Sequence, residues 1–150
     1  MSFTGASILS IEQFSLDDVE RIFAVASRMQ PFASRECVTK VLDGAILGNI
    51  FLEPSTRTRI SFGSAFNLLG GHVRETSDIS SSAFVKGESL QDSARILSGY
   101  SDIICLRHPT SGSVEKFAKH SRVPVINGGD GANEHPTQAL LDLFTIKKEL

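Results

Sequence analysis

Hydrophobic and polar residues follow one another along this chain in blocks whose spacing predicts alternating helices and strands. Between residues 16 and 29, hydrophobic side chains recur every three or four positions, as in a helix with one buried face, and we expect Pro31 to end this helix. Residues 45–52 form an almost unbroken hydrophobic run, typical of a strand buried on both faces. A second helical pattern begins after residue 55 and runs to about residue 69.

The rest of the chain repeats this order of strand and helix. A polar, serine-rich segment at residues 77–87 is expected to be a long loop. The alternation predicts an α/β fold: a doubly wound, mostly parallel four-stranded sheet with right-handed crossovers and helices on both faces. With 150 residues, the chain suits one domain with its own core. The remaining strands are expected at residues 72–76, 102–106 and 123–127, and the remaining helices at residues 89–100, 113–120 and 136–150.

Composition and charge exclude several classes of protein. The chain is 41% hydrophobic and 21% charged, which is ordinary for a folded, water-soluble protein. Its formal net charge of -2 argues against a general nucleic-acid binder, and no hydrophobic run is long enough to span a membrane. The first residues lack the basic and hydrophobic regions of a signal peptide. Cys37 and Cys105 lack the spacing of a metal or redox motif, so we expect a cytoplasmic protein without a metal site, with Cys105 buried.

A cluster of hydroxyl groups and cations stands where the first predicted strand gives way to a helix. Free backbone N–H groups and the positive end of the helix dipole make such a helix start suitable for an anion. Arg57 adds a planar guanidinium that can bind phosphate through two hydrogen bonds, and Ser55, Thr56 and Thr58 add donors. The stretch therefore predicts a phosphate pocket. A role of Ser55 or Thr56 as a helix cap is compatible with it.

Two later loops also carry polar groups directly after predicted strands. Arg107 and His108 follow the third strand, and a glycine-rich loop at residues 128–135 follows the fourth. Ligands of parallel α/β sheets bind beyond the carboxyl ends of the strands. We therefore expect these loops to meet residues 55–59 at one edge of the sheet.

Three local signatures, in this order and spacing, resemble those of one family, the aspartate and ornithine carbamoyltransferases. Residues 55–59, which read Ser-Thr-Arg-Thr-Arg, match its carbamoyl-phosphate motif. Arg107-His108-Pro109 and residues 135–138, His-Pro-Thr-Gln, match its other two motifs. The resemblance covers essentially the whole chain and implies the fold of the family's N-terminal domain.

Three features favour the aspartate branch of this family. Lys86 ends the serine-rich loop directly before Gly-Glu-Ser, residues 129–131 read Gly-Asp-Gly, and Thr137 stands where ornithine enzymes usually carry Cys. The resemblance then implies transfer of a carbamoyl group to the amine of L-aspartate. The products are N-carbamoyl-L-aspartate and phosphate, in pyrimidine (UMP) biosynthesis, and no metal or organic cofactor is implied.

The resemblance also implies how the chain relates to a complete enzyme. Family members are about twice as long and carry a second α/β domain that binds the amino acid. Residues 147–150 lie in a predicted helix that leads into that domain in the family. We therefore expect residues 1–150 to be the carbamoyl-phosphate-binding domain, without the aspartate-binding domain and inactive by itself.

The resemblance assigns the phosphate of carbamoyl phosphate to the first motif and to one later arginine. Ser55, Thr56 and Arg57 would hold the phosphate together with the helix N-terminus. Arg107 would contact the phosphate and the bridging or carbonyl oxygen.

The carbonyl end of the same substrate is assigned to other residues. Thr58 and His135 would donate to the carbonyl oxygen as it gains negative charge, and Gln138 would accept from the carbamoyl amide. Ser82 and Lys86 are similar to residues that family members insert into the active site of a neighbouring subunit. A complete site would then need a homotrimer, and the sequence leaves a regulatory chain open.

Alternatives remain for the whole chain and for single residues. The chain could be an ornithine carbamoyltransferase domain, against which Lys86 and Thr137 speak, or a non-catalytic module for anion binding or assembly. For Arg59, an ion pair with a nearby carboxylate is as well supported as a role in the site, so Arg59 is not assigned to the site. His108 is expected to be structural or on the surface.

Overall fold

A computed structural model describes residues 2–76 and 88–150 of the chain. One helix comes first, and a strand followed by a helix then occurs four times, as the alternating pattern predicts. Short 3-10 turns, Ile11–Gln13 and Ser98–Tyr100, precede α1 and extend α3. The strands are β1 (Ile46–Phe51), β2 (His72–Thr76), β3 (Ile103–His108) and β4 (Val125–Asp130), and the helices are α1 (Leu16–Ala33), α2 (Thr56–Leu68), α3 (Leu90–Leu97), α4 (Ser113–Ala118) and α5 (Pro136–Glu149).

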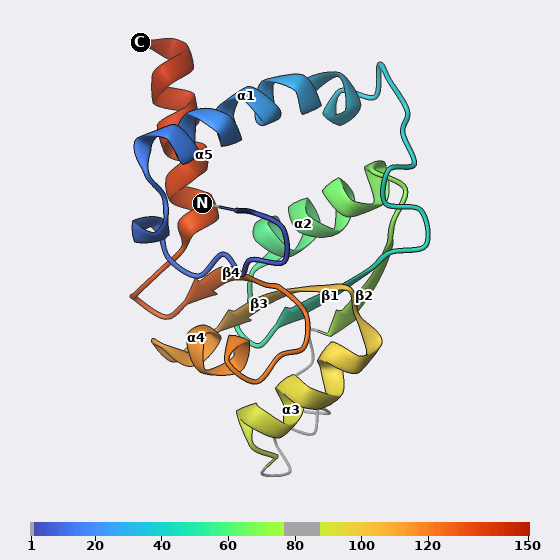
Figure 1. Cartoon of the computed structure of the whole chain (residues 1–150), viewed down its shortest axis with the longest axis vertical. Helices are drawn as coiled ribbons and strands as arrows, with labels where there is room; N and C mark the ends of the chain where they lie inside the picture. Colours follow the sequence, from blue (N-terminus) through green and yellow to red (C-terminus); the bar gives the residue numbers. More distant parts are fainter. Residues whose placement is uncertain (1, 77–87) are drawn as a thin grey trace.

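The four strands form one parallel sheet in the order β2-β1-β3-β4. The first strand, β1, therefore lies in the centre of the sheet, β2 lies at one edge, and the chain then returns through β3 in the centre to β4 at the other edge. Figure 1 shows α3 and α4 on one side of the sheet and α1, α2 and α5 on the other. The prediction of a doubly wound α/β fold with helices on both faces is confirmed.

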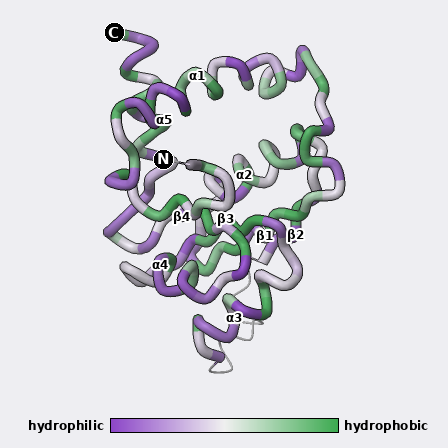
Figure 2. The backbone as a smooth tube through the Cα atoms, in the orientation of Figure 1, coloured by the Kyte–Doolittle hydropathy of each residue, from purple (hydrophilic) through white to green (hydrophobic). Residues whose placement is uncertain are grey.

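Hydrophobic packing on the two faces of the sheet accounts for this arrangement. On one face, Ile104 and Leu106 pack in a cluster with Val114 and Phe117 of α4, all of them fully buried. On the other face, Phe51 and buried Cys105 pack with the hydrophobic side of α2. Figure 2 shows hydrophobic colouring along the central strands. Burial also raises the pKa of the Cys105 thiol, so the prediction of a buried, hydrophobic cysteine is confirmed.

The expectation that Pro31 ends the first helix is wrong, because α1 continues to Ala33. Proline removes one backbone donor and disturbs the turn that precedes it. Here it stands in the last turn, where few helical hydrogen bonds remain to be lost, and Ser34 N still donates to Gln30 O at 2.9 Å.

The fourth strand also differs from the prediction of residues 123–127. β4 begins two residues later, at Val125, and continues through two glycines of the expected loop to Asp130. Pairing with β3 overrides the weak strand preference of glycine, and the register shifts beside Leu106 and His108 as in a bulge. This bulge contains Gly129, whose φ of 118° favours glycine.

The first residues of the chain pair with β4, which the hydrophobic pattern does not predict. Ile8 forms a parallel bridge with Ile126, and its N–H donates to Val125 O at 2.8 Å. Ile8 O in turn accepts from Asn127 N at 2.8 Å. Residues 7–11, called the N-terminal segment below, thus lie along the outer edge of the sheet.

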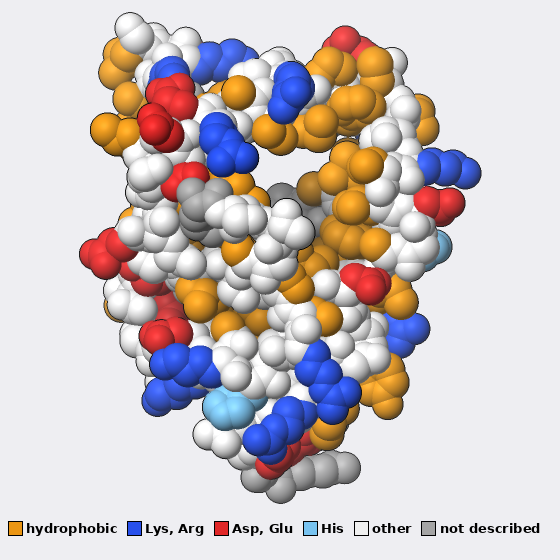
Figure 3. Space-filling model, viewed as in Figure 1, with side chains coloured by type: hydrophobic (Ala, Val, Ile, Leu, Met, Phe, Trp, Pro, Cys, Tyr) orange, Lys and Arg blue, Asp and Glu red, His pale blue; other side chains and the backbone are white. Residues whose placement is uncertain are grey.

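The surface mixes charges of both signs with hydrophobic residues. In Figure 3, hydrophobic side chains gather on both sides of the opening between α1 and α2. Several exposed hydrophobic residues belong to helices on this side of the sheet, among them Met29 of α1, Ile60 of α2 and Leu141 of α5. Among the described helices, none combines the length and the hydrophobicity that crossing a bilayer requires.

Candidate active site

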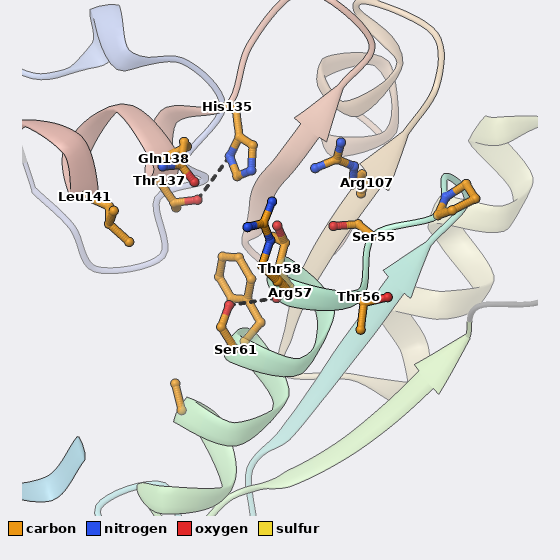
Figure 4. Close-up of a pocket in the computed structure, with 13 residues that line it drawn as sticks. Ser55, Thr56, Arg57, Thr58, Ser61, Arg107, His135, Thr137, Gln138 and Leu141 are labelled. Carbon is orange, nitrogen blue, oxygen red and sulfur yellow. Dashed lines mark hydrogen bonds between the residues drawn. The ribbon is translucent and has the colours of Figure 1, made fainter. Parts of the chain in front are cut away.

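A pocket of about 1060 Å³ lies beyond the carboxyl ends of β1 and β3, between the starts of α2 and α5. Figure 4 shows that its polar side chains come from three separate parts of the chain. The predicted meeting of the post-strand loops is therefore observed. The pocket is lined by Pro54, Ser55, Thr56, Arg57, Thr58, Ser61, Phe62, Ala65, Arg107, His135, Thr137, Gln138 and Leu141.

The start of α2 is left open toward this pocket. Ser55 occupies the N-cap position of α2, as expected for a helix cap. Its side chain, however, makes no cap hydrogen bond. The first turn of α2 contains no acidic residue whose charge would oppose an anion at the helix start. The first N–H groups of a helix lack intrahelical acceptors, and here they are available to a ligand.

Two arginines, two positions apart at the start of α2, have different surroundings. Arg57 lines the pocket, while Arg59 forms an ion pair with Glu75 of β2. Fully buried Asn49 of β1 ties the same group together, because its Nδ2 donates to Arg59 O at 2.9 Å and to Glu75 Oε1 at 3.2 Å. The alternative weighed for Arg59, an ion pair with a carboxylate, is confirmed. This pair fixes α2 on the sheet and leaves Arg57 for the pocket.

Arg107 reaches the pocket from the end of β3, where two groups hold its guanidinium. Its Nε lies 3.4 Å from Glu53 Oε2, and its Nη1 donates to Gly128 O at 3.3 Å. The guanidinium also lies close to Gly129, where an added Cβ would stand 3.0 Å from Nη1. The bulge in β4 thus makes room for this arginine.

His135 is the N-cap residue of α5, and Pro136 occupies the first helical position as predicted. The ring is half-buried, and Nδ1 lies 3.3 Å from Thr137 Oγ1. With the hydroxyl donating to Nδ1, the proton of a neutral imidazole resides on Nε2, which can then donate into the pocket. Burial, and next the nearby charge of Arg107, lower the pKa of His135. The lowered pKa favours the neutral form of the ring near pH 7.

Gln138 lies in the first turn of α5 and lines the same pocket, as its motif predicts. Its Nε2 donates to Asp142 Oδ1 at 2.8 Å. This bond leaves Oε1 of the amide as an acceptor for a ligand N–H group.

The remaining predictions concern Ser82 and Lys86, His108, and a metal site. Ser82 and Lys86 lie outside the described residues. His108 is structural as expected: its Nδ1 accepts from Thr110 N at 3.0 Å, and burial lowers its pKa. Within residues 2–76 and 88–150, no three His, Cys, Asp or Glu side chains gather as a metal site would require.

Sequence reasoning missed several residues that contribute to the pocket. Phe62 and Ala65 continue the face of α2 that begins at Thr58, so helical spacing could have indicated them. Leu141 follows Gln138 by three positions on α5 in the same way. Glu53, which contacts the pocket residue Arg107, gave no such signal, because this contact joins the segment after β1 to β3.

Comparisons with known proteins agree with this arrangement. The family model for "Aspartate/ornithine carbamoyltransferase, carbamoyl-P binding domain" matches residues 6–148. The chain is 71% identical over 150 residues to the aspartate carbamoyltransferase catalytic subunits of Saccharophagus degradans and Cellvibrio japonicus. It covers 44% of each, so it spans less than half the length of these curated relatives.

Solved structures give the same result. Aspartate transcarbamoylase from Trypanosoma cruzi, in complex with carbamoyl phosphate and aspartate, superposes with a TM-score of 0.90 at 42% identity. The match covers 97% of this chain and 48% of that one. The ligand-free form of the same protein gives a TM-score of 0.87.

Proposed function

The chain belongs to the aspartate and ornithine carbamoyltransferase family through its carbamoyl-phosphate-binding domain, and we propose that its pocket binds carbamoyl phosphate for transfer to L-aspartate. One observation carries this proposal: the open start of α2 with Arg57 faces Arg107 and His135 across a single pocket. A phosphate site and a carbonyl site are thus adjacent. The reaction would give N-carbamoyl-L-aspartate and phosphate, a step of pyrimidine biosynthesis.

Aspartate is favoured over ornithine as the acceptor. The curated relatives at 71% identity are aspartate enzymes, and Thr137 occupies the position where ornithine enzymes usually carry Cys. In the structure, the Thr137 hydroxyl contacts the ring of His135, so this position lies directly beside a residue of the proposed site.

The phosphate end of the substrate fits the α2 side of the pocket. Ser55 and Thr56 offer hydroxyl donors beside the helix N–H groups, and Arg57 offers a bidentate cation. Arg107, already oriented by Glu53 and Gly128 O, would contact the phosphate and the bridging oxygen. These groups neutralise the phosphate as it leaves with the electron pair of the broken C–O bond.

The carbonyl end fits the α5 side. When the aspartate amine attacks the carbonyl carbon, a C–N bond forms and negative charge grows on the carbonyl oxygen. The C=O bond then forms again as the C–O bond to phosphate breaks, and the amine gives up one proton to the departing phosphate. His135 Nε2–H and the Thr58 hydroxyl would donate to that oxygen, and Gln138 Oε1 would accept from the carbamoyl NH₂. Because the pKa of His135 is lowered, the ring acts as a neutral donor and does not itself add a charge.

Residues 1–150 would form one half of the complete enzyme, with the aspartate-binding domain supplied by further sequence. Exposed hydrophobic residues on α5, such as Leu141 and Ile146, fit a helix that is covered in the complete protein. We further propose a cytoplasmic homotrimer with shared sites, to which Ser82 and Lys86 of one subunit contribute in the next. A regulatory chain would be an addition to this trimer.

Calorimetric titration of the chain with carbamoyl phosphate and with inorganic phosphate tests the proposal. Tighter binding of carbamoyl phosphate is expected, because only that ligand reaches the α5 side of the pocket. Equal affinities would favour the non-catalytic anion-binding module instead. Absence of carbamoyl-phosphate binding would overturn the proposal.

A further inference from the structure

Glu134, the residue immediately before His135, has its side chain held by a part of the chain that is 124 residues away. Ser10 Oγ donates to Glu134 Oε1 at 2.9 Å, and Ile11 N donates to Oε2 at 3.2 Å. Each carboxylate oxygen thus has its own donor from the N-terminal segment. The family resemblance assigns no role to Glu134, and Glu134 is not among the residues that line the pocket.

The backbone of Glu134 is fixed as well. Its N–H donates to Asp130 Oδ1 at 2.9 Å, and its carbonyl accepts from Asp130 N at 3.1 Å. Asp130 is itself only 2% exposed, and its other oxygen accepts from Gly112 N at 2.8 Å. Both the side chain and the peptide groups of Glu134 are therefore anchored.

Further contacts tie the N-terminal segment to β4. Besides the bridge of Ile8 to β4, Leu9 O accepts from Asn127 Nδ2 at 3.0 Å. A capping box between Ser10 and Gln13 fixes the next turn. The donors that hold Glu134 are thus tied to the same strand, β4, that leads into the loop before His135.

We propose that Glu134 is a positioning residue for His135, and that the N-terminal segment thereby belongs to the carbonyl side of the site. This inference rests on the proposed function. His135 adopts φ -145° and ψ 72°, outside the helix that it caps, so the direction of its ring depends on the peptide before it. Anchoring Glu134 fixes that peptide and aims the imidazole at the carbonyl oxygen of the ligand.

The test compares the affinities of carbamoyl phosphate and inorganic phosphate in four forms of the chain: wild type, Glu134→Ala, Glu134→Gln and Ser10→Ala. Glu134→Ala should lower the preference for carbamoyl phosphate by about fivefold, the size of one net hydrogen bond, and leave phosphate affinity within about twofold. Ser10→Ala removes one of two donors and should lower it by about twofold. Glu134→Gln keeps the shape and one acceptor, so it should retain most of the preference.

This ratio separates positioning from a general loss of structure. If a variant is only partly folded, both apparent affinities fall by the same factor and their ratio does not change. Glu12→Ala, which removes an exposed carboxylate from the same 3-10 turn, is the matched control and should leave the ratio unchanged.

One result would overturn the assignment: a Glu134→Ala variant whose ratio of the two affinities equals that of the wild type, whether both affinities are unchanged or both fall by the same factor. A wild-type chain without any preference for carbamoyl phosphate would instead reject the proposed function, and this inference with it.

Discussion

The starts of α2 and α3 use the same residue type for opposite purposes. Ser89 caps α3 by accepting from Asp92 N at 3.1 Å, and Asp92 adds an acidic group to the first turn. Ser55 occupies the same N-cap position in α2 but makes no cap bond, and no acid follows it. The start of α3 is thus satisfied within the helix, whereas the start of α2 remains available to an outside anion.

This difference shows what a binding site costs locally. A side-chain cap stabilises a protein by about 1 kcal/mol, which α2 gives up. The ion pair of Arg59 with Glu75 and its hydrogen bond to Asn49 hold α2 on the sheet without touching its open end. Stability and ligand binding are therefore divided between neighbouring residues of one helix.

The largest effect should come from removing a donor on the carbonyl side of the pocket. In a full-length enzyme that contains this sequence, His135→Ala or Thr58→Ala should lower the turnover number by about 100- to 1000-fold, as for other oxyanion donors. Steady-state kinetics at saturating substrates measures this. An unchanged turnover number would contradict the oxyanion assignment.

A second substitution makes the start of α2 resemble that of α3. Thr58→Glu creates a capping-box sequence with Ser55 and places a negative charge in the first turn of α2, next to the expected phosphate site. Phosphate affinity measured by calorimetry should fall by about 100-fold, because two like charges meet at close range. Thr58→Gln supplies the same cap without the charge, and it should lose less affinity. Equal losses in both variants would show that charge is not the cause.

The next two variants compare the two arginines of α2. Arg57→Lys should weaken phosphate binding by about tenfold, because an ammonium group cannot reproduce two parallel hydrogen bonds. Arg59→Lys should leave that affinity unchanged and cost at most about 1 kcal/mol in urea unfolding, because its ion pair with Glu75 is partly exposed. A larger loss of phosphate affinity in Arg59→Lys would contradict the division of roles.

Opening α3 provides the opposite experiment. Ser89→Ala combined with Asp92→Ala removes both the cap acceptor and the acidic group of the first turn, and it should lower the free energy of unfolding by about 1–2 kcal/mol. No phosphate binding should appear there, since α3 lacks the two arginines that the pocket adds to α2. Calorimetry on a background of Arg57→Ala, which disables the first site, would detect any new binding.

The smallest effect concerns pH. The pKa values of His135 and His108 are lowered by burial in the folded chain, whereas the unfolded chain has the ordinary value of about 6.5. Between the lowered values and 6.5 the unfolded state binds more protons, so the free energy of unfolding should rise with pH in this window and level off above it. Urea unfolding at several pH values measures this, and a variant with Gln at both positions should show a flatter profile. A steeper profile in that variant would contradict the sign.

Local signals explain why so much of the fold and site could be predicted. The hydrophobic spacing of α2 and the apolar run of β1 reflect contacts that each element makes along its whole length. The meeting of residues 55–58, Arg107 and His135 follows from one rule, that ligands bind where parallel strands end. These predictions needed no knowledge of which side chains touch across the sheet.

Contacts between distant parts of the chain account for what could not be predicted. Glu53 and Arg107 meet only because β1 and β3 are neighbours in register. The glycines at the end of β4 form a strand only because β3 pairs with them. Ser10 and Glu134 leave no periodic pattern, since each contributes a single contact. The anchoring of a site is thus harder to predict than its chemistry.

The pairing of Ile8 with Ile126 has a consequence for the solubility of the domain. β4 is the last strand in the sheet order, and an uncovered edge strand offers open N–H and C=O groups to another chain. The N-terminal segment occupies part of that edge, while the opposite edge is protected differently, by a short β2 that carries Arg74 and Glu75. Loss of the first ten residues would therefore bare β4 to edge-to-edge association, and such a truncated chain should aggregate before its ligand affinity could be measured.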